Sequence, residues 1–504
     1  MKIIHNITMP LNAGKEELFA KIKNDFSLPK DVRCDIYKKS FDCRHGKIKA
    51  VYSVSVNIDT DNEHFSDIIP YEFSPKTKIN LSLSPVIVGM GPAGLFCALT
   101  LTEFGIKPII IDRGEPIEKR VSDVEKFWRG EVLKENSNVQ FGEGGAGTFS
   151  DGKLTCRKND PRGRKVLETF VKYGAPAEIL TDALPHIGTD ILRKIIINIR
   201  RDLQSKGVTF IYNAKLIDIK MDNMRAKKIK TTAGDISCDV LVLAIGNGSF
   251  DTFSMLLSKK FLIEPKPLAI GLRQEHLQRD INFAMYGKEA DNPVLPPASY
   301  SFFHHLDKNT CVYTFCMCPG GYVVNASSIN GRLTTNGMSL SERNAENANS
   351  ALLVSINPAS VKEAMTLQRE IEERAFRVNN GKCPITSDLE KNSIILTTVR
   401  PTIMPETERT DFSKIFPLKI LSALKNGTDL FHKKIFKTQA FEKPIYTAPE
   451  TRTSSPLRFK RDSNSLKAVY TENLYPCGEG AGYAGGIMSS AIDGIKIAEA
   501  ILNN

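Results

Sequence analysis

Three closely spaced glycines followed by an acid are the first residues in the chain whose types and spacing can hold a ligand. Gly89, Gly91 and Gly94 form the pattern GxGxxG within GMGPAG, and Asp112 follows eighteen residues after the last of them. Glycine permits a tight turn, close approach of the backbone to a pyrophosphate and close helix–strand packing, while the acid can hold ribose hydroxyls. The predicted chemistry is binding of a dinucleotide.

The sequence around these glycines supplies the elements that must position them. The motif is preceded by PVIVG, a short β-branched run, and followed by AGLFCALTLTEFG, which has helical spacing, and by KPIIIDRG, a second apolar strand. The predicted βαβ unit points a helix N-terminus at the phosphates. A membrane span is the alternative for this uncharged run, but its central glycines and proline argue against one. We expect further cofactor contacts from Pro92, Ala93 and Arg113.

A second glycine-rich turn, YPCGEGAGYAGGI, lies near the C-terminus. Glu479 stands between Gly478 and Gly480 at the end of a predicted strand, where a carboxylate can hold a polyol chain. The N–H groups of a helix beginning near Gly485 and Gly486 can face a negative ring edge. The alternative is an ordinary turn of an α/β sheet, but this density of glycines favours close approach of a flat or phosphorylated group.

A third glycine-dense segment, FGEGGAGTFSDGK, lies between these two motifs. Gly142, Gly144, Gly145 and Gly147 can let several backbone N–H groups converge on an anion. A flexible surface loop is the alternative, and the presence of two other cofactor motifs favours the binding role.

The rest of the chain has an α/β pattern, and its 504 residues suit two or three domains. A helix is expected at TDILRKIIINIRRDLQSKG, and strands at VTFIYNAKLIDIKMD and CDVLVLAIGNGSF. The expected fold class is α/β, with a discontinuous Rossmann-like domain and an inserted mixed α+β domain. The predicted parts are a small N-terminal α/β module (1–80), the first part of the Rossmann-like domain (81–260), a substrate or cap domain (261–440) and the C-terminal part (441–504).

Composition restricts the class of protein only loosely. The 68 basic and 57 acidic residues give a net charge of +11, which permits weak attraction to nucleic acid or anionic membranes but does not require it. The basic first half of the N-terminal module leaves RNA contact open beside a solvated docking or lid surface. Ten cysteines without CxxC or zinc spacing, and no apolar leader, predict reduced thiols, no metal and a cytoplasmic location.

The motifs together resemble the two-dinucleotide-binding-domain flavoproteins, in which a second strand ends in an Ala-Thr-Gly-like turn. The chain has Ala-Ile-Gly there, within LVLAIGNG, and this places Gly246 at the cofactor. More closely, the chain resembles a poorly characterised bacterial family of FAD-dependent dehydrogenases in VQFGEGGAGTFSDGKL, PHIGTD, FCMCPGGYVV, ETRTSSPLR and GEGAGYAGGI. The resemblance implies bound FAD, with residues 141–153 around the pyrophosphate and the flavin pyrimidine side, Glu479 at the ribityl chain, and oxidoreductase activity on an unidentified substrate.

Few protein groups are expected to take part in the chemistry, because the flavin ring itself carries the hydride. Arg452 and Arg458 can bind a substrate carboxylate or phosphate, or tie the inserted domain to the core. His186 is a candidate acid or base, with a structural histidine as the alternative. Thr189 and Asp190 are expected to cap the helix that follows it.

Other reactive side chains leave more than one interpretation open. Cys316 and Cys318 share a face of a predicted strand and can be a redox pair, substrate-pocket thiols or plain packing. His304 and His305 are adjacent and should face opposite sides of a strand, which argues against a shared metal. Cys477 is interpreted as packing.

The leading hypothesis is an FAD-dependent oxidoreductase, a dehydrogenase or reductase, that transfers hydride between flavin N5 and a small organic substrate. No second complete GxGxxG unit is present, so no separate nicotinamide domain is expected, although NADH or NADPH can bind transiently as reductant. The alternatives are an RNA-associated flavoprotein that presents RNA through residues 1–80, and a flavin-binding regulator without turnover. The substrate and the oligomeric state stay open.

Overall fold

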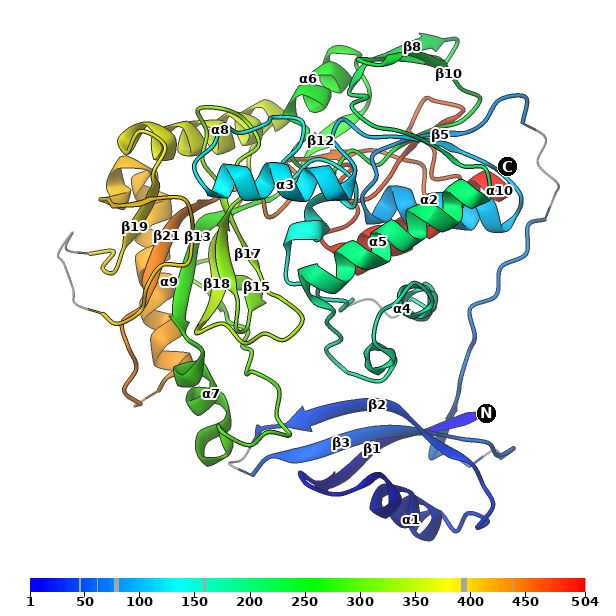
Figure 1. Cartoon of the computed structure of the whole chain (residues 1–504), viewed down its shortest axis with the longest axis vertical. Coiled ribbons are helices and arrows are strands. Elements are labelled where there is room, and N and C mark those ends of the chain that lie inside the picture. Colours follow the sequence, from blue (N-terminus) through cyan, green and yellow to red (C-terminus); the bar gives the residue numbers. More distant parts are fainter. Residues whose placement is uncertain are drawn as a thin grey trace.

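A computed structural model describes residues 1–44, 47–60, 62–76, 81–156, 160–390, 397–437 and 439–503. Its elements form an N-terminal module, a parallel-sheet domain, and a second domain around a larger mixed sheet (Figure 1). The predicted α/β class with parallel and antiparallel sheets is therefore confirmed. No helix among the described residues is long and apolar enough to cross a membrane.

The N-terminal module is an antiparallel four-stranded sheet, in the order β2-β3-β1-β4, with one helix packed against it. Leu18 and Ile22 of the helix are buried with alternate residues of the strands, which is the amphipathic pattern that the sequence predicts. The elements are β1 (Lys2–Pro10), α1 (Lys15–Asp25), β2 (Cys34–Asp42), β3 (Lys49–Val56) and β4 (Phe65–Asp67). The expected end of the module at residue 80 lies outside the described residues.

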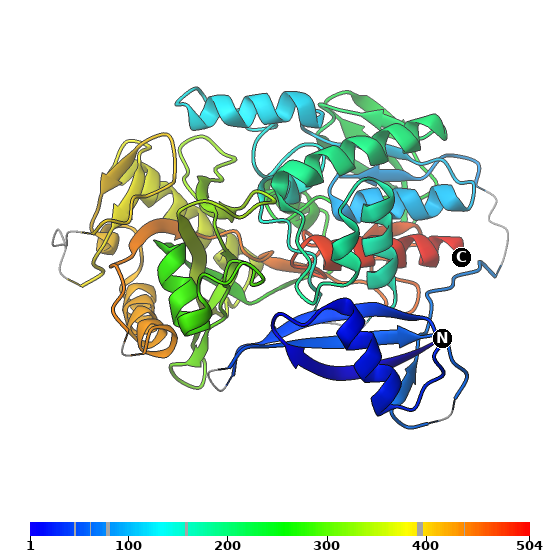
Figure 2. The same ribbon diagram turned by 60° about the horizontal axis from the view of Figure 1, so that its bottom comes forward.

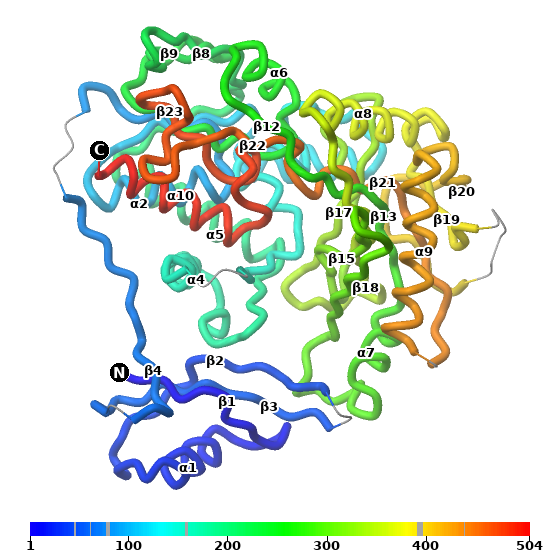
Figure 3. The backbone as a smooth tube through the Cα atoms, turned by 180° about the vertical axis from the view of Figure 1, so that it is seen from behind, coloured from blue at the N-terminus to red at the C-terminus, as the bar shows by residue number. Residues whose placement is uncertain are grey.

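The module packs against the parallel-sheet domain through the backbone of β2. Lys39 donates its N–H to the carbonyl of Thr181 at 2.7 Å and accepts from the N–H of Ala183 at 2.9 Å. Figures 2 and 3 show the module below the larger domains and an extended segment running from it along one side. In that segment, Tyr71 donates to the carboxylate of Glu499.

The parallel-sheet domain is built on five parallel strands in the order β23-β11-β5-β6-β7. These short strands are rich in aliphatic residues, as expected for a sheet covered on both faces. Their bounds are β5 (Val86–Val88), β6 (Ile109–Ile111), β7 (Thr209–Ile211), β11 (Leu241–Leu243) and β23 (Leu474–Pro476). The first and last glycine motifs follow β5 and β23, at the carboxyl edge of one sheet.

Helices and a small antiparallel sheet cover this parallel sheet. Helices α2, α5 and α10 lie close together in Figures 1 and 3 and share one hydrophobic cluster. The helical elements are α2 (Pro92–Glu103), α3 (Ile117–Trp128), η2 (Gly145–Phe149), α4 (Arg162–Lys172), η3 (Ala177–Leu180), α5 (Gly188–Ser205), α6 (Phe250–Ser258) and α10 (Ile487–Leu502). The small sheet consists of β8 (Leu216–Asp222), β9 (Arg225–Thr231) and β10 (Gly234–Ser237).

One predicted strand is in fact two. The sequence from 208 to 222 predicts a continuous strand, whereas the structure places β7 in the parallel sheet and β8 in the small sheet. The chain breaks at Asn213, whose φ of 54° is left-handed and whose N–H donates to the carbonyl of Gly114. Asparagine tolerates this conformation better than most residues, so a break there is physically reasonable.

The second domain has a seven-stranded sheet in the order β14-β15-β18-β13-β21-β19-β20. It includes β21, beyond the expected boundary at residue 440, because β21 pairs with β13. Its strands are β13 (Leu268–Leu277), β14 (Phe303–His305), β15 (Cys311–Cys318), β18 (Asn347–Ile356), β19 (Cys383–Thr386), β20 (Thr407–Arg409) and β21 (Ile445–Glu450). Its helices are α7 (Gln278–Tyr286), η4 (Gly287–Glu289), α8 (Val361–Val378), η5 (Phe412–Lys414) and α9 (Leu418–Ile435), and a separate hairpin has β16 (Tyr322–Asn325) and β17 (Thr335–Met338).

The chain enters and leaves the second domain at adjacent positions. Strands β12 (Ile263–Pro265) and β22 (Leu457–Phe459) pair antiparallel, with Ile263 opposite Phe459. The domain is therefore an insertion between β11 and β23 of the parallel sheet, and both of its connections run through one two-stranded ribbon.

Two histidines lie in the aromatic core of the second domain. The Nε2 atoms of His276 and His432 are 3.3 Å apart, and Phe431, Phe436 and Phe441 surround the two rings. Burial lowers the pKa of His432 to about 4 and that of His276 well below its ordinary value. Both rings are therefore neutral in the folded protein, since burial of a charge without a counter-ion is unfavourable.

This pair predicts a loss of stability in mild acid. The unfolded chain takes up protons on both histidines as the pH falls below about 6.5, while the folded chain does not until far lower pH. Each histidine should reduce the free energy of unfolding by up to ~1.4 kcal/mol per pH unit between about pH 6 and 4. Urea denaturation at several pH values measures this. A His276→Leu/His432→Leu variant is the control and should show a shallower pH dependence; equal slopes would contradict the prediction.

Candidate functional site

The glycine turn after β5 is held against its neighbours at two of its three glycines. A Cβ atom at Gly89, whose φ is 109°, would lie 2.2 Å from the carbonyl oxygen of Ala244, and one at Gly94 would lie 2.0 Å from the carbonyl oxygen of Gly89. A Cβ atom at Gly91 would lie 3.7 Å from the Cα atom of Gly145. Gly89 and Gly94 are thus required by packing, while Gly91 faces a narrow space in front of the α2 N-terminus.

Asp112 holds the conformation of this turn. Its side chain is buried and accepts hydrogen bonds from the N–H groups of Met90 at 2.9 Å and Gly114 at 2.8 Å, one on each oxygen. A carboxylate oxygen accepts more than one hydrogen bond, so ribose hydroxyls can still be bound. Arg113 forms a bidentate pair with Asp251, which commits its charge to the protein.

The glycine-dense segment is a packed loop that one arginine holds in place. The guanidinium of Arg120, 0% exposed, donates five hydrogen bonds of 2.6 to 3.3 Å, to four main-chain carbonyls and the Thr148 hydroxyl. The buried carboxylate of Glu143 accepts from Arg200 at 2.8 Å and from the N–H of Ile117 at 2.9 Å. Burial lowers the pKa of Arg120 to about 9, so the side chain stays charged at neutral pH.

This loop faces the first glycine turn. The N–H of Gly144 donates to the carbonyl of Met90 at 2.8 Å, and a Cβ atom at Gly145 would lie 3.0 Å from the Cα atom of Gly91. A Cβ atom at Gly142 or Gly144 would collide with the side chains that hold the loop, and one at Gly147 would approach Ile487 at the start of α10. The two segments therefore enclose a gap that only unsubstituted backbone leaves open.

The C-terminal motif adds a carboxylate and a second helix N-terminus. The amide of Asn247 donates to Glu479 and to the carbonyl of Arg452, each at 2.8 Å. Burial raises the pKa of Glu479 to about 7, against the positive charge of Lys266 and the Asn247 hydrogen bond. The side chain can therefore either donate or accept a hydrogen bond near neutral pH. Helix α10 begins at Ile487.

The backbone beside this carboxylate is open. A Cβ atom at Gly246, Gly485 or Gly486 would meet no atom within 4 Å, whereas one at Gly480 would lie 2.2 Å from the carbonyl oxygen of Gly246, and one at Gly478 would lie 2.7 Å from the Cβ of Ala93. Gly478 and Gly480 allow β11, α2 and the C-terminal turn to pack closely. The three glycines with free space beside them line the carboxyl edge of the parallel sheet. A narrow gap at Gly91, two helix N-termini and two inward carboxylates fit a dinucleotide cofactor.

His186 lies beside a buried acid at the end of the glycine-dense loop. Its Nε2 atom is 3.9 Å from Asp151, which also pairs with Arg343 at 2.5 Å. Burial and the charge of Arg343 lower the pKa of His186 to about 4, so the ring is neutral at neutral pH. A neutral imidazole can accept a proton or serve as a structural hydrogen-bonding group, and both roles stay open.

The expected helix cap after His186 is wrong. The N-cap residue of α5 is Ile187, and no side chain caps the helix. Thr189 donates instead to the carbonyl of Thr148, and Asp190 accepts from the N–H and hydroxyl of Ser341. These side chains lie two and three residues after the N-cap position, and they fix α5 to its neighbouring loops.

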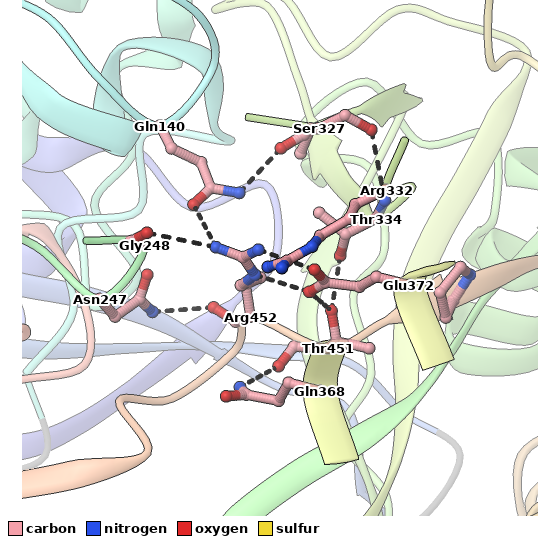
Figure 4. Close-up of polar contacts among 12 residues, drawn as sticks. Gln140, Asn247, Gly248, Ser327, Arg332, Thr334, Gln368, Glu372, Thr451 and Arg452 are labelled. Carbon is pink, nitrogen blue, oxygen red and sulfur yellow. Dashed lines mark hydrogen bonds and ion pairs between the residues drawn. The ribbon is translucent and has the colours of Figure 1, made fainter. Parts of the chain in front are cut away.

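Arg452 joins the two large domains. It forms a bidentate pair of 2.6 and 2.7 Å with the fully buried Glu372 of α8, and it also reaches the carbonyl of Gly248 at 3.3 Å (Figure 4). Thr451 donates to the same carboxylate at 2.6 Å. Because this guanidinium already has a buried carboxylate, the geometry favours the domain-tying interpretation over substrate binding.

Arg458 differs from Arg452 in its surroundings. Its side chain is exposed, lies 5.5 Å above the ring of Tyr483, and has no carboxylate partner among the described residues. Arg458 lies close to Lys266 in the fold, because Glu264 pairs with Arg458 in the register of β12 and β22 and the N–H of Lys266 donates to the carbonyl of Pro456. Arg458 therefore stays a candidate for binding an anionic substrate group.

Two other expectations concern histidines and thiols. His304 and His305 are exposed on the edge strand β14, and no group of three or more His, Cys, Asp or Glu residues suited to a metal occurs in the described part of the chain. Cys477 is buried just after β23, and its N–H donates to the carbonyl of Leu243.

Several residues of the site were not expected from the sequence. Arg120 lies on an amphipathic helix, where a charged residue usually faces water, and no local pattern marks it as buried. Asn247 lies between two glycines in the turn after β11. This position is the sequence signal that could have marked Asn247 as a residue of the site. Lys266 has no comparable signal, because it approaches Glu479 only in the folded chain.

Comparison with known proteins supports FAD as the cofactor and gives no support to a nicotinamide. Residues 267–453 match the family model "FAD-dependent protein, C-terminal domain-like". An uncharacterised protein of Clostridium beijerinckii is 41% identical, over 99% of this chain and 98% of its own. Among solved structures, flavin-dependent brominase Bmp2 is 13% identical with a TM-score of 0.34, covering 83% of this chain and 79% of its own. Glycine oxidase from Bacillus cereus is 10% identical with a TM-score of 0.31, covering 83% and 94%.

Gly91→Val is expected to abolish FAD retention without unfolding the protein. The valine Cγ atoms would press against Gly145 in front of the α2 N-terminus, beside which the pyrophosphate is expected. The flavin released from purified protein by denaturation measures retention. Gly14→Val is the control, because it makes the same change in the N-terminal module, where a Cβ atom meets no atom within 4 Å. Normal flavin content in Gly91→Val would refute the assigned position.

Glu479→Ala is expected to weaken FAD binding by about tenfold, the effect of losing one hydrogen bond to a carboxylate. Glu479→Gln keeps a donor and an acceptor and should lose less. Titration of apoprotein with FAD, followed by quenching of flavin fluorescence, measures both affinities. Unchanged affinity in the alanine variant would count against a contact between Glu479 and the ribityl chain.

Proposed function

The chain belongs to the same family as the uncharacterised Clostridium beijerinckii protein, and from this premise we propose that it is an FAD-dependent oxidoreductase that transfers hydride between flavin N5 and a small organic substrate. The observation that carries the proposal is the meeting of three glycine segments at one edge of the parallel sheet. Gly91 and Gly145 lie close to each other there and the position beside Gly246 is open, so that backbone rather than side chains faces the place proposed for a large and partly flat cofactor.

Each part of the site has a role in holding FAD. The α2 N-terminus and Gly91 would hold the pyrophosphate, and Asp112 the adenosine ribose. Glu479, with Asn247 orienting it, would hold the ribityl chain. The first N–H groups of α10 would face the electron-rich edge of the ring. When bound, FAD supplies the hydride acceptor or donor, and the protein orients and tunes it.

Two side chains are suited to the substrate. Arg458 has an exposed guanidinium without a carboxylate partner in the described part of the chain, and it can bind a carboxylate or phosphate in bidentate fashion. His186, neutral at neutral pH, can accept a proton from a donor group if the substrate reaches it. An anionic small molecule that gains or loses hydride fits these two groups.

The proposal is tested by the visible spectrum of the purified protein, before and after anaerobic addition of NADH and NADPH. We expect two flavin absorption bands. Bleaching by either nucleotide would identify it as the reductant, and bands that persist would assign reduction of the flavin to the substrate itself. A colourless protein that also fails to bind added FAD would overturn the proposal.

A further inference from the structure

Strand β15 of the second domain ends in a bulge that carries two cysteines. The register between β15 and β18 shifts between Phe315 and Cys318, and Cys316 in this interval has a left-handed φ of 41°. A non-glycine residue adopts that conformation only where its surroundings hold it, and bulges often redirect a side chain at a functional site. Cys316 is half-buried, whereas Cys318 is fully buried.

A buried arginine forms a hydrogen bond with the backbone of the bulge. The guanidinium of Arg273 donates to the carbonyl of Cys316 at 2.9 Å, to the side-chain oxygen of Asn349 at 3.1 Å, and to Glu450, its paired carboxylate. Arg273 is 0% exposed, and a Cβ atom at Gly337 would lie 2.4 Å from it. The positive charge is therefore fixed next to the cysteines and cannot turn away toward water.

The two thiols have unequal surroundings. The S–H of Cys318 donates to the carbonyl of Cys316, with 3.2 Å between sulfur and oxygen, and lies beside the Cys316 thiol. The neighbouring Cys318 S–H, with the charges of Arg273 and Lys153, lowers the pKa of Cys316, while burial raises that of Cys318. The proton of the pair thus stays on Cys318, and Cys316 carries the negative charge.

The bulge lies beside the glycine-dense loop. The carbonyl of Pro319, directly after the bulge, accepts from the hydroxyl of Ser339 at 3.0 Å, and Arg343 of the same segment pairs with Asp151 of the glycine-dense loop at 2.5 Å. The side-chain nitrogen of Asn349, opposite Cys318 in the sheet, is buried and has no hydrogen-bond partner among the described residues. A donor without a partner at this position is available to a ligand.

We propose that Cys316 is the nucleophile of a site for small disulfides, with Cys318 as its positioning residue. The Cys316 thiolate attacks one sulfur of the disulfide, a new sulfur–sulfur bond forms as the old one breaks, and the departing thiolate takes a proton from water. One half of the substrate is reduced to a thiol while Cys316 becomes a mixed disulfide. The inference names a substrate class for the proposed flavin site and rests on it only for the position of the pocket.

Disulfides suit the Cys316 thiolate better than hard electrophiles do. A polarisable thiolate reacts readily with sulfur, and its rate depends on its own ionisation and access. The half-buried position of Cys316 admits a small molecule, and Lys153 can attract one that carries carboxylates. Oxidised glutathione has both features and is the probe to use.

Alkylation of the purified protein with iodoacetamide tests the thiolate. At about pH 7, Cys316 should react at least tenfold faster than Cys43, as its larger thiolate fraction implies. Cys43 is a matched control in the N-terminal module, half-buried as well, but with a pKa raised by burial and Asp42. The pH midpoint for Cys316 should lie below the ~8.5 of a free thiol. Equal rates, or a midpoint at or above that of a free thiol, would overturn the proposal.

Two substitutions of Cys318 test its positioning role. Cys318→Ala removes the donor and should raise the pH midpoint of Cys316 alkylation, whereas Cys318→Ser keeps a donor and should raise it less. Thermal unfolding of both variants separates this effect from loss of structure. If both variants leave the midpoint unchanged while folded, Cys318 does not position the thiolate.

Incubation with oxidised glutathione tests the substrate class. Peptide mass spectrometry should find glutathione on Cys316 in the wild type, and the adduct should be absent in Cys316→Ser. Absence of the adduct in the wild type would refute the disulfide site. None of these readouts uses the flavin, so a reactive Cys316 in a colourless protein would contradict only the proposed function, and an inert Cys316 in a yellow protein only this inference.

Discussion

The buried guanidinium of Arg120 is the interaction on which the geometry of the cofactor edge depends. A charge in the interior is tolerated only when its donors are satisfied, and here main-chain carbonyls of residues 138–143, rather than a carboxylate, satisfy most of them. Every one of those carbonyls must point inward at once, which leaves the loop a single conformation. That conformation brings Gly144 and Gly145 against the turn after β5. Without it, no backbone would lie opposite Gly91.

Buried ion pairs within the second domain orient the side chain of Arg452, which reaches the carbonyl of Gly248 in the other large domain. Arg273 pairs with Glu450 at the end of β21, and two residues later Arg452 pairs with Glu372 of α8. Such pairs contribute little net stability compared with apolar packing, but each has few geometries in which all donors are satisfied. They therefore act mainly on orientation, which is what a site shared between the glycine loops and the bulge of β15 requires. The Asn247 amide links Arg452 to Glu479, because it donates hydrogen bonds to the carbonyl of Arg452 and to the Glu479 carboxylate.

Sequence patterns predicted what is local. GxGxxG, its flanking strands and the helix after it have strong short-range preferences, and the start of α10 follows from its glycine pair. The patterns did not indicate Arg120 or Arg273, because the signal for a buried arginine is a set of acceptors brought together only by folding. The break at Asn213 and the absence of a side-chain cap at Ile187 were missed for a related reason. A neighbouring backbone carbonyl, at Gly114 or Thr148, decided those positions rather than the residue itself.

The paired ribbon of β12 and β22 has a consequence for biosynthesis. On the ribosome, β5, β6, β7 and β11 emerge before the second domain, whereas β23 and the Glu479 turn emerge after it, so the cofactor edge stays incomplete while some two hundred residues are made. Because Ile263 and Phe459 end up opposite each other, a second domain that has already folded presents its two ends together. The late strand then closes a short loop instead of a long one, which greatly reduces the entropy lost in completing the sheet.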